Sequence, residues 1–401
     1  MPIQYPLYKP QTQKMSKRIH YITQSMLSLI ILLWACQNKE QEGQSSIDAE
    51  FTHSSSNKVY LHDLQPDKWQ AVDSAYIDEQ GKVSFQFTPG KTGFYTISTD
   101  RDNLAILQVY PDTSQSISAD IRQIPQSYET QGSKGSKLLE SFKKTSLKHR
   151  NTIDSLLWEK TNYSGDNIEQ QQAETDSLIE VIRQKQKQYQ LKLVRNNKDV
   201  LAVLIPLFQP FGRKPLFTIE DHPGLFDSVH TALKKQYPQN PHVLDLYERI
   251  TKYNAQQRET EEREKKLQVS NEAPPFSLKN IHGKQVNLPD LQGNYVLLDF
   301  WWEHAANYRE NRRQIAQETQ TQPNLIYFSV YQGNDKLIWK ELAEKYPENS
   351  VHARAEKVVQ NMYNAKDKER LFLISPEGKI LAKDFDPDEL TRIIQENETK
   401  E

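Results

Sequence analysis

Residues able to perform nucleophilic, acid–base or metal chemistry are few in this chain of 401 residues. There is one cysteine, Cys36, so neither an intrachain disulfide nor a dithiol pair can form. Six histidines between residues 222 and 352 form no short pair of the kind that binds zinc. Gly132–Lys137 has the wrong spacing for a phosphate loop, and no nucleophile elbow or calcium loop occurs. We therefore expect no catalytic residue, no metal site and no cofactor site.

The single cysteine ends an N-terminal segment that has the three parts of a signal peptide. Met15–Arg18 is basic, an apolar run extends over Met26–Trp34, and Leu33–Cys36 follows. The apolar run is too short for a permanent transmembrane helix and has the proportions of a signal-peptide core.

Leu33–Cys36 resembles the bacterial lipobox. This resemblance implies that the thiol of Cys36 is acylated and that the chain is cut just before it. The alternative is a buried free cysteine in an N-terminal helix, but the polar residues 37–40 argue against a core helix. We expect residues 1–36 to be a signal peptide whose true start is Met15, and two or more acyl chains to anchor the mature protein in a membrane.

Length and composition set the broad organisation. A chain of 401 residues predicts two or three compact units. Hydrophobic residues make up only 36%, which favours several modest cores joined by solvated helices. The formal net charge is −2, so no basic face indicates a nucleic-acid partner.

We predict an α+β multidomain chain with a small antiparallel β-sandwich, a helical middle region and a C-terminal α/β thioredoxin-like fold. Residues 37–46 are polar and read as a tether, 47–130 as the sandwich, 131–266 as the helical region and 267–401 as the C-terminal domain.

The sandwich and the helices are predicted from hydrophobic periodicity. Short strands with partial alternation are expected at residues 58–61, 71–77, 82–87 and 93–97. On Val72–Ala75, Gly81 and Gly93–Tyr95 this segment resembles the uncharacterised β-domain near the N-terminus of many Bacteroidetes lipoproteins. Apolar residues three and four apart predict helices over 138–158, 168–194 and 242–266.

The C-terminal segment is predicted to be α/β. Val296–Trp301 and Leu325–Val330 read as buried strands, and residues 371–374 and 379–382 flank a turn as an antiparallel hairpin. Helices are expected around 306–319, 335–346, 353–363 and 387–397.

Three motifs in this segment resemble the thioredoxin-like, peroxiredoxin-related domains of bacterial envelope lipoproteins. They are Ala273–Leu278, the hairpin and turn over residues 283–293, and Asp299–Trp301. The resemblance covers about 130 residues and implies a Cys-x-x-Cys pair at the start of the next helix.

Both cysteines are replaced here, because Ala305 and Tyr308 occupy their positions. Dithiol exchange needs a thiolate to attack and a second cysteine to resolve the mixed disulfide, so neither half-reaction can start. The resemblance also implies a cis-proline, and the matching residue is Glu369. A cis bond before a non-proline residue costs about 3 kcal/mol, so we expect a trans bond. We predict that the protein is not an enzyme.

Asp299 matches the buried acid that assists proton transfer in thioredoxins, and without a cysteine we interpret it as a structural group bonded to its neighbours. Other polar residues should gather at the edge of the former active site as a candidate binding face. They are Glu303, His304, Ala305, Tyr308, Arg309, Glu369 and Arg370. A new acid–base or metal site among them is the alternative, but a lone histidine beside a carboxylate is more often part of a surface ion pair.

The leading hypothesis is a non-catalytic, lipid-anchored envelope protein that uses a redox-inactive thioredoxin-like domain to bind a protein or peptide, as a subunit of an outer-membrane complex. A cysteine-independent enzyme and a chaperone-like holder of envelope proteins are the alternatives. The expected partners are the membrane, through the anchor, and an outer-membrane protein. Lys39–Glu42 loosely resembles the export tag of surface lipoproteins in Bacteroidetes, which favours the cell surface over the periplasmic face.

Overall fold

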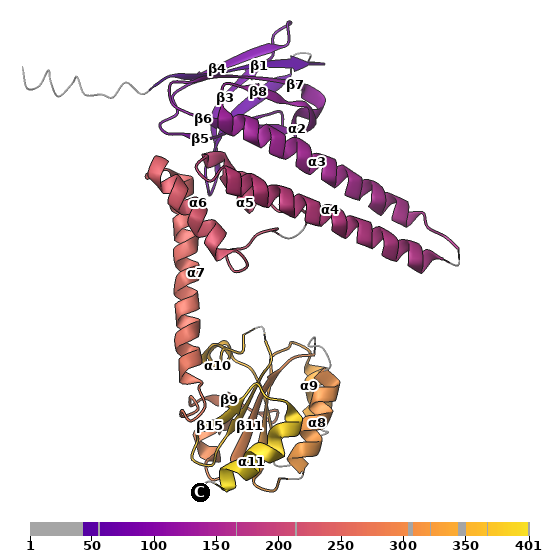
Figure 1. Ribbon diagram of the computed structural model, residues 1–401, viewed down its shortest axis with the longest axis vertical. Helices are drawn as coiled ribbons and strands as arrows, with labels where there is room; N and C mark the ends of the chain where they lie inside the picture. Colours follow the sequence, from indigo (N-terminus) through magenta and orange to yellow (C-terminus); the bar gives the residue numbers. More distant parts are fainter. Residues whose placement is uncertain are drawn as a thin grey trace, which may run out of the picture. The chain divides into compact units, whose positions relative to one another are not determined.

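Figure 1 shows the computed structural model of the chain, which divides into two compact units, Met1–Thr251 and Lys252–Glu401. The structure describes residues 43–54, 57–165, 167–212, 215–303, 308–320, 322–343, 350–366 and 368–399, without the side chains of Tyr308, Arg309 and Leu342. Several sheets and long helices occur together, which confirms the predicted α+β multidomain class.

Two four-stranded sheets form the β-domain of the first unit, in the orders β4-β1-β7-β8 and β3-β2-β5-β6. The strands are β1 (Ser45–Thr52), β2 (Lys58–Leu64), β3 (Trp69–Tyr76), β4 (Lys82–Phe87), β5 (Gly93–Ser98), β6 (Leu104–Val109), β7 (Ser114–Asp120) and β8 (Glu129–Gln131). All pairs are antiparallel except β1 with β7, which is parallel. The sequence analysis did not predict this exception. β1 and β7 are far apart along the chain, so no tight turn between them forces antiparallel pairing.

The two sheets pack face to face around one hydrophobic core. Ile47 and Phe85 come from the first sheet, and Leu61, Ile97 and Leu107 come from the second, and all five are fully buried. Burial alternates along β1, β4 and β7, so the opposite face of the first sheet is exposed. This is the sandwich that the strand spacing predicts.

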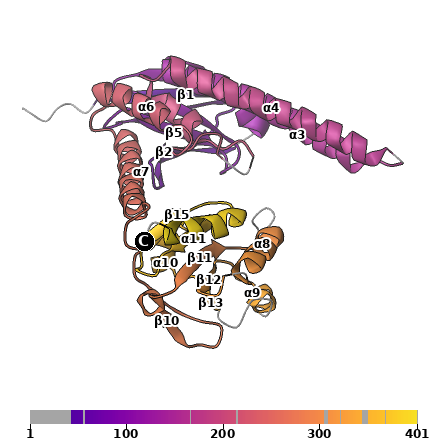
Figure 2. The same ribbon diagram turned by 60° about the horizontal axis from the view of Figure 1, so that its bottom comes forward.

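Helices follow the sandwich. They are α2 (Ile124–Ser127), α3 (Lys134–Thr161), α4 (Ile168–Asn196), α5 (Leu204–Phe208), α6 (Pro223–Gln236) and α7 (Pro241–Lys266), with the 3-10 turns η1 (Ile121–Gln123) and η2 (Leu201–Val203). The three predicted long helices correspond to α3, α4 and α7. In both views α3 and α4 run side by side as a long hairpin (Figures 1 and 2).

Gln108 on β6 attaches the helices to the sandwich. Its backbone carbonyl accepts hydrogen bonds from Ser133 Oγ at 2.9 Å and Ser136 Oγ at 3.2 Å, and its Oε1 accepts from Ala202 N at 2.7 Å. Gly135 is required at this contact, since a Cβ there would lie 2.2 Å from Gln108 Oε1. The two oxygens of Gln108 therefore accept hydrogen bonds from the start of α3 and from η2.

The second unit is built on a five-stranded sheet in the order β13-β12-β11-β14-β15, with a separate β9–β10 hairpin. Its strands are β9 (Ser277–Lys279), β10 (Gln285–Asn287), β11 (Tyr295–Trp301), β12 (Leu325–Tyr331), β13 (Val351–Arg354), β14 (Arg370–Ile374) and β15 (Ile380–Lys383). β11, β12 and β13 are parallel, and β14 runs antiparallel to β11. β15 pairs antiparallel with β14, as the predicted hairpin, and so runs in the same direction as β11.

Helices cover both faces of this sheet. They are α8 (Tyr308–Gln320), α9 (Lys336–Ala343), α10 (Lys357–Met362) and α11 (Leu390–Glu398), with the 3-10 turns η3 (Leu288–Leu291) and η4 (Pro387–Glu389). α8 and α11 share one core with Leu297 and Tyr327, while α10 packs with Phe300 and Phe372 on the other face. The sequence analysis did not predict β13. Its last two residues were expected to begin the helix over 353–363, but pairing with β12 overrides the local pattern.

Candidate functional site

Asp299 on β11, which the family resemblance matches to a buried acid, is a buried carboxylate in the structure. Its side chain is 2% exposed and forms an ion pair with Arg312. The Tyr327 hydroxyl donates a hydrogen bond of 2.6 Å to Asp299 Oδ2, and Arg312 Nη1 lies 3.2 Å from the same hydroxyl. Asp299 is thus a structural group bonded to its neighbours, as the sequence analysis expects.

Arg312 comes from α8, and the sequence analysis did not single it out. Its side chain is 6% exposed, and its guanidinium lies 5.5 Å from the centroid of the Trp301 ring. The spacing of residues in the sequence could have identified it. Arg312, Ile315 and Thr319 recur at helical spacing, and all three are buried, so this face of α8 packs against the sheet. Arg313 lies on the outer face instead, where it pairs with Glu310.

Glu303 lies just after β11, and its carboxylate is bound by Tyr331, the last residue of β12. The Tyr331 hydroxyl donates a 2.7 Å hydrogen bond to Glu303 Oε2 and accepts one from Asp335 N at 3.1 Å. Burial, followed by the Glu303 hydrogen bond, raises the pKa of Tyr331. A Cβ at Gly333 would overlap Glu303 Oε2 and the Tyr331 hydroxyl, so a larger residue there would displace this hydrogen bond.

Glu369 occupies the position that the family resemblance gives to a cis-proline. No peptide bond among the described residues is cis, so the bond before Glu369 is trans, as expected. Glu369 Oε1 is buried and has no hydrogen-bond partner within the described ranges. Burial raises the pKa of the Glu369 carboxyl, and the charge of Arg312 opposes this shift. The Glu369 carboxyl is therefore poorly solvated.

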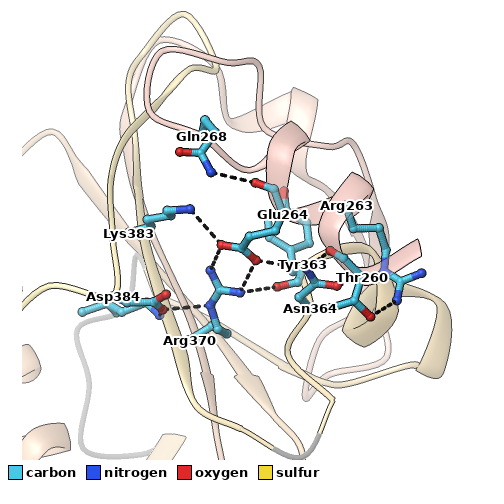
Figure 3. A network of polar contacts seen from close by, with 10 residues as sticks. Thr260, Arg263, Glu264, Gln268, Tyr363, Asn364, Arg370, Lys383 and Asp384 are labelled. Carbon is cyan, nitrogen blue, oxygen red and sulfur yellow. Dashed lines mark hydrogen bonds and ion pairs between the residues drawn. The ribbon is translucent and has the colours of Figure 1, made fainter. Parts of the chain in front are cut away.

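Arg370, the next residue, faces the other way, because successive side chains of a strand point to opposite faces. It is 3% exposed rather than part of an accessible face. Its Nη1 and Nη2 bond the two carboxylate oxygens of Glu264 at 3.0 and 3.2 Å, and its Nε bonds Asp384 Oδ1 at 2.8 Å. Figure 3 shows this network. The predicted placement of Arg370 on the binding face is thus corrected, since its guanidinium is already used inside the unit.

Glu264, near the end of α7, is the centre of that network. It also accepts hydrogen bonds from Lys383 Nζ at 2.8 Å and Asn364 Nδ2 at 3.0 Å (Figure 3). Burial acts to raise the pKa of Glu264, but the hydrogen bonds from Arg370, Asn364 and Lys383 outweigh it and lower the pKa to about 2. The carboxylate stays ionised at neutral pH.

The network explains where the second unit begins. Arg263 and Thr260 of α7 also bond Asn364, through Arg263 Nε at 2.9 Å and the Thr260 carbonyl at 3.0 Å. The last turns of α7 therefore belong to the C-terminal unit, which starts at Lys252. The sequence placed the boundary at residue 267, because the charged run over 258–266 was interpreted as a solvated helix face.

The remaining predicted site residues fall outside what is described. Cys36, His304 and Ala305 are outside the described residues, and Tyr308 and Arg309 are described only as the backbone that begins α8. Among the described residues, no cluster of three or more His, Cys, Asp or Glu side chains could hold a metal ion. No helix within the described ranges is both long and apolar enough to cross a bilayer.

The chain resembles known proteins over about a third of its length. No family model matches it. Over 118 residues, 29% of this chain, it is 25% identical to the thiol-disulfide oxidoreductase ResA of Bacillus subtilis. The matched region covers 66% of ResA, slightly less than two thirds of that protein's length.

Solved structures are similar over about the same share of the chain. The thioredoxin domain of a thiol-disulfide oxidoreductase from Bacteroides vulgatus is 23% identical, with a TM-score of 0.30, and the match covers 32% of this chain and 96% of that one. A thiol:disulfide interchange protein from Bacteroides sp. is 24% identical, with a TM-score of 0.29, over 32% of this chain and 89% of that one.

The sheet order, the helices on its two faces and the ResA match agree with one another. ResA is a thiol-disulfide oxidoreductase by name, whereas this chain has one cysteine, at position 36. About 30% of the chain therefore resembles a thioredoxin-like domain of the thiol-disulfide oxidoreductase type, in a chain that has one cysteine.

Proposed function

We propose that the protein is a non-catalytic, lipid-anchored envelope protein whose thioredoxin-like domain binds a protein or peptide. The observation that carries this proposal is the single cysteine of the chain, Cys36, which precedes the domain by more than 200 residues. Thiol–disulfide exchange within one protein needs both an attacking and a resolving thiol. One cysteine supplies at most one of them.

The buried polar groups of the former active site support the proposal. In a dithiol mechanism a buried acid must exchange protons with the thiol, and here Asp299 is bound by Arg312 and Tyr327. Glu303 is bound by Tyr331, and Glu369 lies in the field of Arg312. Each of these carboxylates is thus balanced by groups of the protein itself, Asp299 and Glu369 by Arg312 and Glu303 by Tyr331, which favours a structural arrangement over an acid–base pair acting on one substrate.

A direct test is turnover. The purified chain is expected to show no reduction of insulin disulfides with dithiothreitol above the uncatalysed rate, because no thiolate stands at the helix start. The thioredoxin-like unit of a two-cysteine relative serves as the positive control. Turnover that survives Cys36→Ser and removal of contaminating thioredoxin would contradict the non-catalytic proposal.

The start of α8 is the proposed contact surface for the partner. The first backbone N–H groups of a helix have no intrahelical acceptor and can bond a peptide carbonyl or carboxylate, and Tyr and Arg are frequent hot-spot types. Tyr308→Ala with Arg309→Ala is expected to abolish co-purification of the partner from solubilised membranes. The matched control is Arg313→Ala, on the outer face of the same helix. If the folded double variant retains every partner, the contact lies elsewhere on the protein.

Membrane attachment is a separate part of the proposal, and it rests on the lipobox-like sequence before Cys36. We propose the outer membrane as the location and a membrane protein complex there as the partner. Mass spectrometry of the mature N-terminus is expected to find an acylated Cys36 as the first residue. An unmodified cysteine, or a chain that still begins at Met1 or Met15, rules out the anchor.

A further inference from the structure

The exposed face of the sheet β4-β1-β7-β8 carries a regular array of small polar and charged side chains. The strand register aligns them in two rows across four strands. The rows are Ser84–Asp48–Ser116–Gln131 and Lys82–Glu50–Ser118–Glu129. All eight side chains are exposed, on the face opposite the sandwich core.

This face is hollowed. The hollow has a volume of about 830 Å³, which is within the range of small-molecule and oligosaccharide-sized sites. Serine side chains line its floor, and longer side chains stand around them: Tyr76 and Asp78 at the β3–β4 end, and Glu129 and Lys137 beside β8. The concavity follows from short residues on the central strands between longer ones at the edges.

The chemistry of the hollow restricts its ligand. Neither Asp48 nor Glu50 is engaged by a side-chain hydrogen bond or ion pair in the described part of the chain, so both carboxylates are available as acceptors. Four carboxylates and two lysines line the hollow, which disfavours nucleic acid and anionic lipid. β1 and β7 are hydrogen-bonded on both sides, so the floor has no free strand edge for a peptide.

The aromatic rim of the hollow is Tyr76, at the end of the edge strand β3. Its side chain is 69% exposed. The contacting rings of Trp69, His62 and Tyr60 lie on the outer face of the other sheet, because Val59 and Leu61 on β2 face the core, and they are not part of the hollow. A large exposed ring beside a hollow offers a flat apolar surface on which a ligand can stack.

We propose that this hollow and its aromatic rim bind an uncharged oligosaccharide. Sugar hydroxyls donate to Asp48 and Glu50 and accept from Lys82 and from the serine hydroxyls, while the apolar C–H face of a sugar ring stacks on an aromatic ring. A basic peptide is the rival ligand for an acidic face. The serine floor and the aromatic rim favour the sugar, because neither supplies a counter-charge. The site lies in the first unit and is independent of the function proposed for the thioredoxin-like domain.

Calorimetric titration of the full chain with cellohexaose, maltohexaose, xylohexaose, mannohexaose and chitohexaose tests the proposal, with tetralysine as the rival probe. At least one hexasaccharide is expected to bind with a Kd below about 5 mM. The variant Asp48→Asn with Glu50→Gln is expected to weaken that binding by about tenfold or more, since it removes two charged hydrogen-bond acceptors. Ser116→Leu, which fills the floor, is expected to abolish it.

The matched control is Asp102→Asn with Glu169→Gln, which removes the same two charges at exposed positions outside the hollow. It should leave the Kd within about twofold, and circular dichroism should show that all variants remain folded. The proposal is overturned if no hexasaccharide binds, if the Asp48 and Glu50 variant binds as tightly as the control, or if tetralysine binds and the sugars do not.

Discussion

Two buried arginines of the C-terminal unit neutralise carboxylates in different settings. Arg312 and Asp299 form a closed pair, with side chains 6% and 2% exposed. Arg370 is equally buried, but its partners Glu264 and Asp384 are 34% and 47% exposed. The first pair has no access to water, whereas water can replace a lost partner in the second.

The two arginines therefore have different structural roles within one domain. The closed pair, together with the Tyr327 hydroxyl, holds the Asp299 carboxylate inside the unit. The open network joins Glu264 of α7 to Arg370 of β14, to Lys383 of β15 and to Asn364 in the loop after α10. Several contacts therefore hold the end of α7 on this unit. Loss of one member of the closed pair should therefore be more damaging than loss of one member of the open network.

The largest expected effect is that of Arg312→Ala. It leaves Asp299 buried beside Tyr327 without its counter-charge, and the free energy of unfolding of the C-terminal unit should fall by about 3–5 kcal/mol. Hydrogen exchange of the β11 amides in denaturant measures this unit separately from the first. Arg313→Ala, an exposed member of the same helix, is the control and should change stability by less than about 1 kcal/mol. Equal effects of the two changes would contradict the closed-pair description.

The next largest effect concerns the end of α7. A fragment spanning residues 252–401 is expected to be more stable than a fragment spanning 267–401 by about 2 kcal/mol, because the shorter one leaves Arg370 buried without Glu264. Urea unfolding of both fragments measures the difference. Glu262→Ala in the longer fragment is the control, since Glu262 is exposed and outside the network. If the shorter fragment is equally stable, α7 is not part of the unit.

A smaller loss of stability is expected when the pH is lowered. The folded pKa of Glu264 is lowered from 4.5 to about 2, so its stabilising contribution is complete above pH 4.5 and is lost as the pH falls towards about 2. Glu264→Gln removes this contribution at every pH. The difference in stability between wild type and Glu264→Gln should therefore shrink over that interval. The control is Glu262→Gln, whose difference from wild type should be smaller and should not follow this course.

Sequence reasoning reached the fold of the C-terminal unit because its signals are local. The buried strand over Val296–Trp301 and the hairpin around residues 375–378 appear as an apolar run and a turn, and the structure has both. β13 and the parallel pairing of β1 with β7 were missed, since they depend on partners far along the chain.

The site was predictable only in part, for a related reason. The sequence located Asp299 and Glu369 through family motifs, but Arg312 and Glu264 lie on helices whose buried faces had to be known first. Glu264 was hidden within a run of charged residues, most of which are exposed. The role of Glu264 can be recognised only in the folded structure, where Arg370 and Lys383 lie beside it.

The smallest expected effect is the return of redox activity when cysteines are restored. Ala305→Cys with Tyr308→Cys supplies the two thiols, and a disulfide can form between them if their positions allow it. Insulin reduction should nevertheless stay close to the uncatalysed rate. The Asp299 carboxylate is bound by Arg312 and Tyr327 and is not available to take a proton from the second thiol. Glu369, with its buried carboxyl, stands where the family has proline.

The same cysteine pair with Arg312→Met and Glu369→Pro separates these causes. If the thiols alone were missing, the two-cysteine variant would already turn over at the rate of a two-cysteine relative, and the further changes would add nothing. If the closed Asp299–Arg312 pair and Glu369 oppose the reaction, activity should rise only in the four-residue variant, and the two-cysteine variant with Arg312→Met alone gives the share of the pair. Thiol pKa values, measured by the pH dependence of iodoacetamide alkylation, provide a readout that does not depend on turnover, because the attacking form is the thiolate. Similar alkylation profiles in both variants would show that the Arg312 pair has no influence on the site.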